Sequence, residues 1–365
     1  MKKVVILYGG KSGEHEVSLR SAASILRHLD RRSFAPTLVG IAKDGTWLLQ
    51  GGEVDAEALR GDAPLSLGAG PRVFAAPGAG LVVEVAGAIE SLDCDLVFPV
   101  LHGSFGEDGT VQGLLEVAGL PYVGAPVLGS ALGMDKEKAK ELWLRAGLPV
   151  LPYLVVRTAD LALPGAAESL ETKVGGSLGW PAFVKPVCAG SSVGASKVSR
   201  AQELLPALRE ALAWDEKAMV EPFVEAREIE CAVLGNAAPV AYVPGEIAPT
   251  HEFYDYEAKY LDPDGARLEI PARIGAEQSA RIRSIAIAAY AACELAGMAR
   301  VDFFLDKRSG EIYLNEVNTI PGFTSISMYP RMCEAGGLPY SELITRLAEL
   351  ALERHQRRSS IRFSR

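Results

Sequence analysis

Apolar and polar positions alternate between strand and helix patterns from the first residues of the chain. Residues 2–8 form an apolar run that predicts a buried strand, and after the loop GGKSGEHE the segment SLRSAASILRHL has a helical period with Ser18 as its N-cap. A second apolar run at 94–103 precedes GEDGTVQGLLEVAG, which predicts a helix ending at Gly119. These units predict a small N-terminal α/β domain, with an irregular Gly-, Ala- and Pro-rich stretch around 61–80.

The pattern changes after a charged helix predicted at 134–147, for which Gly147 is the stop. WPAFVKP and GASKV predict two strands around a loop of small residues. Ser199 with Gln202 resembles a capping box for the helix AQELLPALREAL, and Pro206 should distort this helix or move its start.

The remainder of the chain predicts mainly antiparallel strands. AMVEPFV, EIECAVLG and PVAYVPGEI are strand candidates joined by short turns, and a polar, aromatic loop at about 248–268 precedes the helix AEQSARIRSIAIAAYAACELAG. ARVDFFLD and EIYLNEVN then form a hairpin around KRSG, and SELITRLAELALERH is a final helix. The basic tail at 356–365 is expected to be a solvated, disordered end.

Composition narrows the class of partner. The chain has 365 residues, is 48% hydrophobic and carries a net charge of -9, which suits two or three domains and argues against a nucleic-acid or membrane-surface partner. The N-terminal apolar run is too short for a secretory signal, and no run approaches the roughly 18 residues of a membrane span, so we expect a cytoplasmic protein. Five scattered cysteines without a CxxC predict neither a disulfide framework nor a zinc site.

The hairpin brings polar side chains together. If it turns near Ser309, paired residues have numbers that sum to about 618, so Asp302 faces Glu316, and Arg300 and Asn318 lie on the same face. Two facing carboxylates repel each other unless a cation lies between them, and such hard oxygen ligands suit Mg²⁺ shared with nucleotide phosphates. A solvated face with incidental acids remains the alternative, since the sequence does not fix the register.

A second candidate for chemistry is the small-residue loop in KPVCAGSSVGASK (185–197). Its backbone N–H groups could approach phosphate oxygens closely, with Lys185 adding a positive charge, although a flexible hairpin tip has the same composition. GKS at 10–12 is not a P-loop, because Val5 stands where the first glycine is required. The absence of GxGxxG from GGKSGEHE weakens a dehydrogenase interpretation.

Taken in order along the chain, these segments resemble the D-alanine-D-alanine ligases of the ATP-grasp superfamily. The resemblance runs through GGKSGEHEVSL, LHGSFGEDGTVQGLLE, GLPYVG, MDKEKAK, VKPVCAGSSVGASKV, VEPF, FYDYEAKY, RVDFF and LNEVNTIPGFTSISMYP. It implies an α/β fold, α+β in part, of three domains. A Rossmann-like α/β domain (1–133) would precede two ATP-grasp subdomains built on antiparallel sheets, a lid (134–224) and a catalytic subdomain (225–355), with the basic tail at 356–365.

The resemblance also implies the reaction and its cofactors. ATP would phosphorylate the carboxylate of one D-alanine, and the amine of a second would displace phosphate to give D-alanyl-D-alanine for peptidoglycan. Two Mg²⁺ ions, replaceable by Mn²⁺, would be held by Asp302, Glu316 and Asn318. The residues implied to bind ATP are Lys136, Lys185, Ser191, Ser192, Glu221, Glu228 and Lys259.

Two D-alanine subsites follow from the same resemblance. Glu14 would pair with the first ammonium, and His102 would lie near the first carboxylate. Arg300 and the backbone N–H of Gly322 would stabilise the oxyanion of the tetrahedral intermediate. The residues implied to hold the second D-alanine are Ser327, Met328 and Lys259.

The loop FYDYEAKY is implied to close over the reacting groups. The Tyr260 hydroxyl would bond Ser191, and Ser191 would meet Glu14, so that one chain of hydrogen bonds joins the three domains. A homodimer through the N-terminal domain is also implied. The alternatives are a ligase that joins D-alanine to D-lactate or D-serine, another carboxylate-amine ATP-grasp ligase, and an inactive binding protein, against which the retained Asp302 and Arg300 argue.

Overall fold

The computed structural model describes residues 1–51, 63–249 and 266–362. The predictions made for Lys259 and Tyr260 therefore concern residues outside the described part of the chain. Within the described ranges, every helix is too short or too polar to span a membrane.

The N-terminal sheet is parallel at its centre, as the strand-loop-helix pattern predicts. Its strand order is β3-β2-β1-β7, with β1 between two parallel neighbours and β3 antiparallel at the edge. The central strand β1 is buried from Val4 onward, which is typical of a parallel strand covered on both faces. The elements are β1 (Lys2–Gly9), α1 (His15–His28), β2 (Phe34–Ile41), β3 (Trp47–Gln50), β7 (Leu96–Val100) and α2 (Thr110–Val117).

Helix α1 begins earlier than the sequence pattern indicates. It starts at His15, so Ser18 lies inside the first turn and is not the N-cap. The Ser18 hydroxyl instead accepts a hydrogen bond from the Gly9 backbone N–H and donates one to the Val100 carbonyl oxygen. The prediction for Ser18 was wrong because this hydroxyl ties α1 to the ends of β1 and β7. The stop at Gly119 is confirmed, since Gly119 has a φ of +77° just after α2.

The stretch expected to be irregular is ordered in its second half. An antiparallel meander of order β4-β5-β6 is formed by β4 (Val73–Ala76), β5 (Gly80–Val85) and β6 (Ala88–Leu92). Val73 and Leu81 are buried against the N-terminal sheet. The expectation of irregular structure therefore fails from Val73 onward, because the apolar side chains of this Gly-rich segment complete a core.

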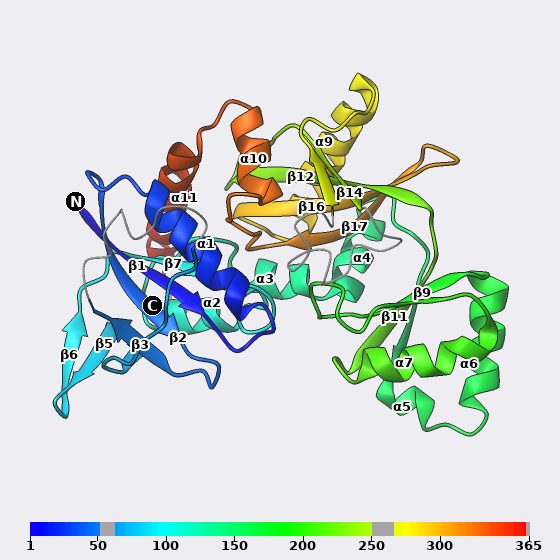
Figure 1. Cartoon of the computed structure of the whole chain (residues 1–365), viewed down its shortest axis with the longest axis horizontal. Helices are drawn as coiled ribbons and strands as arrows, with labels where there is room; N and C mark the ends of the chain where they lie inside the picture. Colours follow the sequence, from blue (N-terminus) through cyan, green and yellow to red (C-terminus); the bar gives the residue numbers. More distant parts are fainter. Residues whose placement is uncertain (52–62, 250–265, 363–365) are drawn as a thin grey trace.

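The second sheet is antiparallel and has the order β10-β9-β11-β8, with α7 packed against it. It forms the lobe at the right of Figure 1. AMVEPFV therefore pairs with β8 and β9 and not with EIECAVLG. The elements are β8 (Leu154–Arg157), α5 (Thr158–Leu161), α6 (Ala166–Ser177), β9 (Ala182–Pro186), β10 (Ser196–Val198), a 3-10 turn η1 (Ala201–Glu203), α7 (Leu204–Leu212) and β11 (Lys217–Pro222).

The start of α7 differs from the predicted capping box. The Ser199 backbone N–H donates to the side chain of Glu203 at 2.9 Å, so the capping partner is not Gln202. Pro206 lies in the first turn of α7, where a proline costs least, and this confirms that it moves the start of the helix.

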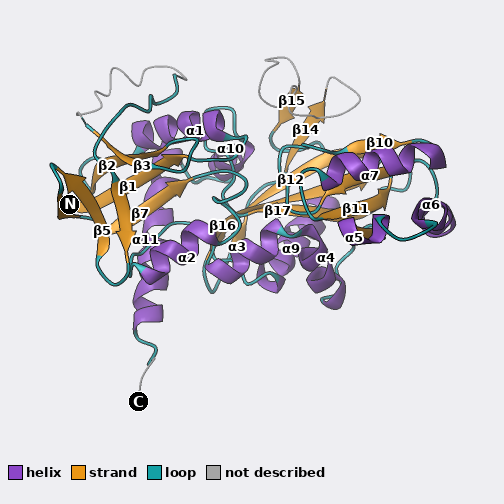
Figure 2. Ribbon diagram, turned by 90° about the horizontal axis from the view of Figure 1, so that it is seen from below, coloured by secondary structure: helices purple, strands orange, loops and turns teal. Residues whose placement is uncertain are grey.

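The third sheet supports the candidate site. Its order is β15-β14-β12-β16-β17, with β13 on β12, and α9 packs on one face beside α3 and α4 (Figure 2). The elements are α3 (Val127–Met134), α4 (Lys136–Arg145), β12 (Ala226–Gly235), β13 (Val240–Ala241), β14 (Gly245–Pro249), β15 (Ala266–Glu269), α9 (Ala276–Ala292), β16 (Gly297–Asp306) and β17 (Ile312–Asn318).

Two C-terminal helices, α10 (Met328–Ala335) and α11 (Tyr340–Ser359), join the first and third sheets. Helix α11 contacts α1, β7, β12 and β16, and one apolar core runs through all of them. The tail expected to be disordered from 356 is helical as far as Ser359. Basic side chains are favourable in the last turn of a helix, and Arg358 also pairs with Glu116 at 2.8 Å.

Candidate active site

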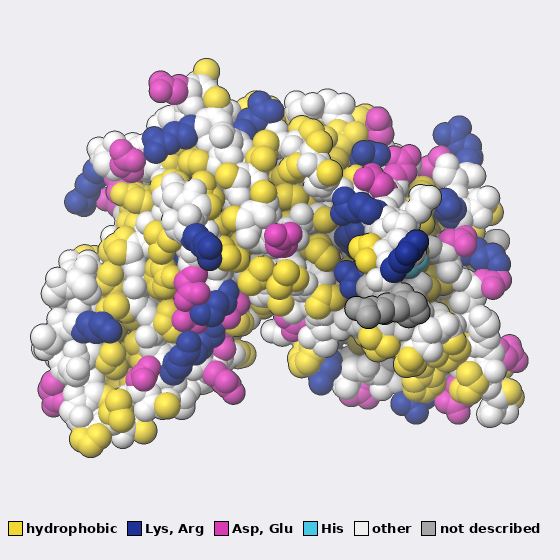
Figure 3. Space-filling view, turned by 180° about the vertical axis from the view of Figure 1, so that it is seen from behind, with side chains coloured by type: hydrophobic (Ala, Val, Ile, Leu, Met, Phe, Trp, Pro, Cys, Tyr) yellow, Lys and Arg dark blue, Asp and Glu magenta, His cyan; other side chains and the backbone are white. Residues whose placement is uncertain are grey.

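A cavity of about 1300 Å³ lies where the three sheets approach one another. In the space-filling view from behind, the lobe that carries the second sheet is separated from the rest of the molecule by a notch at the lower edge (Figure 3). Every predicted site residue that the structure describes lines this cavity. These residues are Glu14, His102, Lys136, Lys185, Ser191, Ser192, Glu221, Glu228, Arg300, Asp302, Glu316, Asn318, Gly322, Ser327 and Met328.

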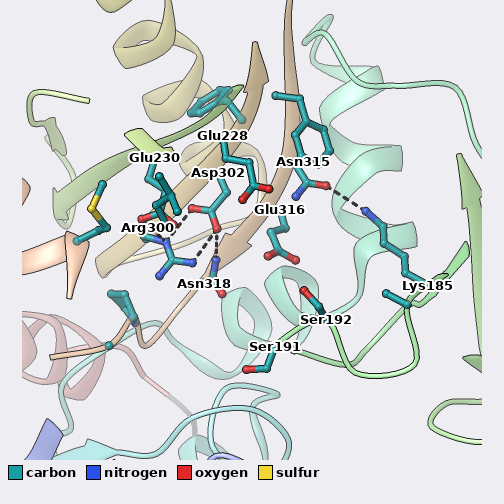
Figure 4. Close-up of a pocket in the computed structure, with 18 of the residues that line it drawn as sticks. Lys185, Ser191, Ser192, Glu228, Glu230, Arg300, Asp302, Asn315, Glu316 and Asn318 are labelled. Atoms are coloured by element: carbon teal, nitrogen blue, oxygen red, sulfur yellow. Dashed lines mark hydrogen bonds and ion pairs between the residues drawn. The ribbon is translucent and has the colours of Figure 1, made fainter. Parts of the chain in front are cut away.

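The predicted hairpin register is confirmed at the residues that carry the candidate chemistry. Asp302 on β16 pairs with Glu316 on β17, and Arg300 pairs with Asn318. Burial alternates along β16, because Val301, Phe303 and Leu305 pack toward α9 while the intervening side chains face the cavity. The period of two thus places the polar residues on one wall (Figure 4).

A third carboxylate extends this row. Glu230 on β12 pairs with Asp302, so Glu230, Asp302 and Glu316 lie side by side across three neighbouring strands. Sequence reasoning missed Glu230, although it lies two residues after Glu228 in a predicted strand and so shares its face.

Cationic side chains of the chain offset the repulsion within this row. The Arg300 guanidinium donates two hydrogen bonds of 2.8 Å to Asp302 and also pairs with Glu230 at 3.1 Å. The Lys136 ammonium pairs with Glu316 at 3.1 Å. Burial opposes the charge on Arg300, but the two carboxylates raise its pKa well above the usual value. The cation that two facing acids require is therefore supplied by the chain itself in this structure.

The same wall fits a magnesium ion in the chemistry of its donors. Asp302, Glu316 and Asn318 offer carboxylate and amide oxygens, which are the hard ligands that Mg²⁺ prefers. The Asn318 amide nitrogen donates a hydrogen bond to Asp302 at 2.9 Å. A bound ion would therefore displace Asn318 and Arg300 from the Asp302 carboxylate. In the described ranges, no group of three or more His, Cys, Asp and Glu is arranged to hold a metal, so the fit rests on two acids and an amide.

The small-residue loop lies at the end of β9 and reaches the start of α1. Ser191 and Ser192 both have positive φ, 53° and 59°, which is uncommon for residues with a Cβ and indicates a tightly turned loop. The Ser191 hydroxyl donates to the Glu14 carboxylate at 2.6 Å, and the Lys136 ammonium donates to the Ala189 carbonyl oxygen at 2.9 Å. The contact expected between Ser191 and Glu14 is therefore present.

Glu221, which is expected to bind ATP near the adenine, pairs with two buried lysines in this structure. It is 2% exposed and pairs with Lys140 through one carboxylate oxygen and with Lys185, at 2.6 Å, through the other. Burial alone would raise the pKa of Glu221, but the two lysines lower it to about 2. Both carboxylate oxygens of Glu221 thus pair with lysines.

A chain of hydrogen bonds links His102 to the loop that follows β17. The Phe323 backbone N–H donates to Ser21 Oγ at 3.3 Å, Ser21 lies 3.1 Å from His102 Nε2, and His102 Nδ1 lies 3.0 Å from the Ile320 carbonyl oxygen. Since that carbonyl can only accept, Nδ1 carries the proton. Burial lowers the pKa of His102, which agrees with a neutral ring. His102 thereby holds the segment next to Gly322 in place.

The residues expected to hold the second D-alanine lie at the start of α10. Ser327 is the N-cap residue of α10, and its hydroxyl accepts a hydrogen bond from the Thr324 backbone N–H at 2.9 Å. A Cβ added to Gly322 would lie 2.8 Å from Ser327 Oγ, so the two residues are in close contact. Backbone N–H groups at a helix start favour a carboxylate.

Further residues of the site were missed by sequence reasoning. Glu107 is partly buried and accepts hydrogen bonds from the backbone N–H groups of Gly103 and Ile320, and no pattern in the sequence indicated this. Asn315 accepts from Lys185 at 3.0 Å because a register shift after Asp302 turns it toward the cavity. Lys140 lies four residues after Lys136 on the same helical face, a spacing that could have revealed it.

Two family models and two similar proteins match this chain to the same family. The family model described as D-ala D-ala ligase N-terminus matches residues 3–125, and the one described as D-ala D-ala ligase C-terminus matches 142–349. A D-alanine--D-alanine ligase of Treponema denticola is 51% identical over 96% of each chain. The D-alanine--D-alanine ligase A of Bradyrhizobium diazoefficiens is 50% identical, over 98% of this chain and 97% of its own.

Solved structures agree over nearly the whole chain. The D-alanine-D-alanine ligase from Coxiella burnetii has a TM-score of 0.83 and 36% identity, over 98% of this chain and 96% of its own. The VanG D-Ala:D-Ser ligase from Enterococcus faecalis also has a TM-score of 0.83, with 37% identity over 96% of this chain and 99% of its own. The fold is thus an ATP-grasp fold, and the chain belongs to the D-alanine-D-alanine ligase family.

Proposed function

We propose that the protein is an ATP-dependent ligase that joins two D-alanines to D-alanyl-D-alanine through a D-alanyl phosphate, for peptidoglycan synthesis. The observation that carries this proposal is the meeting of two walls in one cavity. The β16/β17 hairpin supplies Asp302, Glu316 and Asn318, and the Ser191 loop closes onto Glu14 opposite it. One wall suits a nucleotide with its metal, and the other suits an amino acid.

The lysines would contact the phosphates of the nucleotide, and the acids would hold its metal ions. Lys136 and Lys185 would contact the α and β phosphates, with N–H groups of the Ser191 and Ser192 loop around the phosphate oxygens. We infer that Asp302, Glu316 and Asn318 hold two Mg²⁺ ions, or Mn²⁺ in their place. Such ions neutralise the charge that shifts toward the leaving phosphate during phosphoryl transfer.

The amino-acid side uses residues from the N-terminal domain and from the loop after β17. Glu14 would pair with the ammonium of the first D-alanine, whose carboxylate would lie near His102. Arg300 and the Gly322 backbone N–H would stabilise the oxyanion when the second amine attacks. Ser327 and the Met328 N–H would hold the second carboxylate, and the cavity walls would keep water from the acyl phosphate. By resemblance, Lys259 and Tyr260 would complete the site.

The domain boundaries, the oligomeric state and the location of the enzyme are proposed on the same basis. We infer domains at 1–133, 134–224 and 225–355, a homodimer formed through the N-terminal domain, and action in the cytoplasm, where ATP is available. The similarity to a D-Ala:D-Ser ligase makes D-alanyl-D-serine the second candidate product.

The experiment offers D-alanine, L-alanine, D-serine and D-lactate as second substrates, with D-alanine, ATP and Mg²⁺ present. Phosphate release and product mass are measured for each. We expect D-alanyl-D-alanine to be the main product, with ADP and phosphate formed in equal amounts. A main product containing D-serine or D-lactate would overturn the proposed specificity, and a lack of any D-alanine-dependent phosphate release would overturn the proposed reaction.

A further inference from the structure

A buried cluster of two lysines and one glutamate lies behind the phosphate end of the cavity. Lys140 is fully buried and contacts one oxygen of Glu221, while Lys185 contacts the other oxygen at 2.6 Å. Glu221 is the carboxylate that neutralises Lys140 in the described part of the chain, and the Tyr153 ring lies 5.7 Å from the Lys140 ammonium.

The position of Lys140 indicates that it does not meet a ligand itself. Lys136 and Lys185 line the cavity, but Lys140 does not, although it lies on the same face of α4 as Lys136. A buried charge is costly unless it is paired, and burial lowers the pKa of the Lys140 ammonium while the Glu221 carboxylate opposes the change. Packing alone therefore does not explain why a charged lysine is buried at this position.

The charge balance of the cluster supplies this reason. Two ammonium groups and one carboxylate carry a net charge of +1. Without Lys140, Glu221 would neutralise Lys185 and the cluster would present no net charge to a polyphosphate. We propose that Lys140 is a positioning residue that occupies Glu221 and thereby keeps the positive charge of Lys185 available to the phosphates of the nucleotide. This inference rests on the proposed binding of ATP and extends it.

The test compares nucleotides that differ only in phosphate. Dissociation constants for ATP, ADP and adenosine are measured by calorimetry, or by competition with ADP for the weaker adenosine. The proteins are the parent, Lys140→Met and the double variant Lys140→Met with Glu221→Gln, which restores the net charge of +1. The matched control is Lys138→Met, which removes one exposed charge from the same helix, where Lys138 pairs with Glu141.

We expect Lys140→Met to weaken ATP and ADP binding about 10- to 100-fold, as the loss of one buried charge implies, and to change adenosine binding less than about 2-fold. The double variant should regain most of the lost ATP affinity, and Lys138→Met should stay within about 2-fold of the parent because exposed charges are screened. A purely structural role would weaken adenosine as much as ATP.

Several outcomes would overturn the inference while leaving the proposed function intact. They are parental ATP affinity in Lys140→Met, an equal loss for adenosine, and a double variant as weak as the single one. Failure of the parent to bind ATP would instead overturn the proposed function. Thermal unfolding of each variant shows whether it is folded, and the ratio between ATP and adenosine affinity keeps the test valid for a less stable variant.

Discussion

The acids of the cavity wall are held by cations of the chain before any ligand binds. Asp302 is paired with Arg300, and Glu316 is paired with Lys136. The repulsion expected between these carboxylates is therefore already offset, and a metal ion that binds there would have to displace protein partners. Glu230 also pairs with Arg300, so Arg300 would keep one carboxylate partner if Asp302 bound a metal ion.

This arrangement gives a prediction for Asp302→Asn. Turnover should fall by at least about 100-fold, since one of the two acids proposed to hold Mg²⁺ is lost. The unfolding free energy without ligands should also fall, by about 1 to 3 kcal/mol, because Arg300 loses its bidentate partner. Activity assays and urea denaturation measure both effects. Asp306→Asn, at the exposed end of the same strand, is the control and should remain within about 2-fold of parental activity.

Glu107 gives a prediction about pH. Burial, aided by the nearby Glu14, raises the pKa of Glu107 from its ordinary value of 4.5 to about 8, although two backbone N–H groups oppose the increase. Between these values the native protein binds a proton that the unfolded chain has released, so the contribution of Glu107 to stability falls as pH rises.

Replacing Glu107 with glutamine removes this titration. The unfolding free energy of Glu107→Gln, relative to that of the parent, should therefore increase between about pH 5 and pH 8. Urea denaturation across that range measures the difference, with Glu311→Gln at an exposed turn position as control. A difference that stays constant with pH would contradict the raised pKa of Glu107.

At the scale of elements, regular periodicity was predictable and local exceptions were not. The alternation along β16 placed Arg300 and Asp302 on one face, and the structure confirms it. The register shift after Asp302 has no sequence signature, so Asn315 was not expected at the cavity. Ser18 shows the same limit, because its hydroxyl bonds to strand ends that are distant in sequence, and helix-start preferences do not include such contacts.

The small-residue loop gives a prediction for Gly194. Its φ is +70°, and an added Cβ would lie 2.6 Å from Trp214 Cδ1 and 3.0 Å from Pro186 Cγ, so Gly194→Ala must shift the loop or the ring. We expect kcat/KM for ATP to fall by about 10-fold or more, with the Trp214 fluorescence altered. Gly113→Ala, in α2 with nothing near the new methyl group, is the control and should be neutral or slightly stabilising. Parental kinetics in Gly194→Ala would show that the loop does not depend on this contact.

At the scale of the whole molecule, the site exists because distant segments converge on one cavity. Glu14 and Ser191 are 177 residues apart in sequence, and their hydrogen bond joins the start of α1 to the lobe of the second sheet. The order of the motifs made the family recognisable from the sequence. The depth of the cavity and the pairing of Lys140 with Glu221 depend on how the sheets pack, which no local pattern contains.

In the proposed reaction, the carboxylate of one D-alanine attacks the γ-phosphorus of ATP, and the amine of the second D-alanine then displaces phosphate. D-alanine labelled with ¹⁸O in its carboxylate tests this directly, with mass spectrometry of the released phosphate and of the dipeptide. We expect one ¹⁸O atom in each phosphate, together with ADP and D-alanyl-D-alanine in equal amounts. Phosphate without the label, or release of AMP and pyrophosphate, would contradict it.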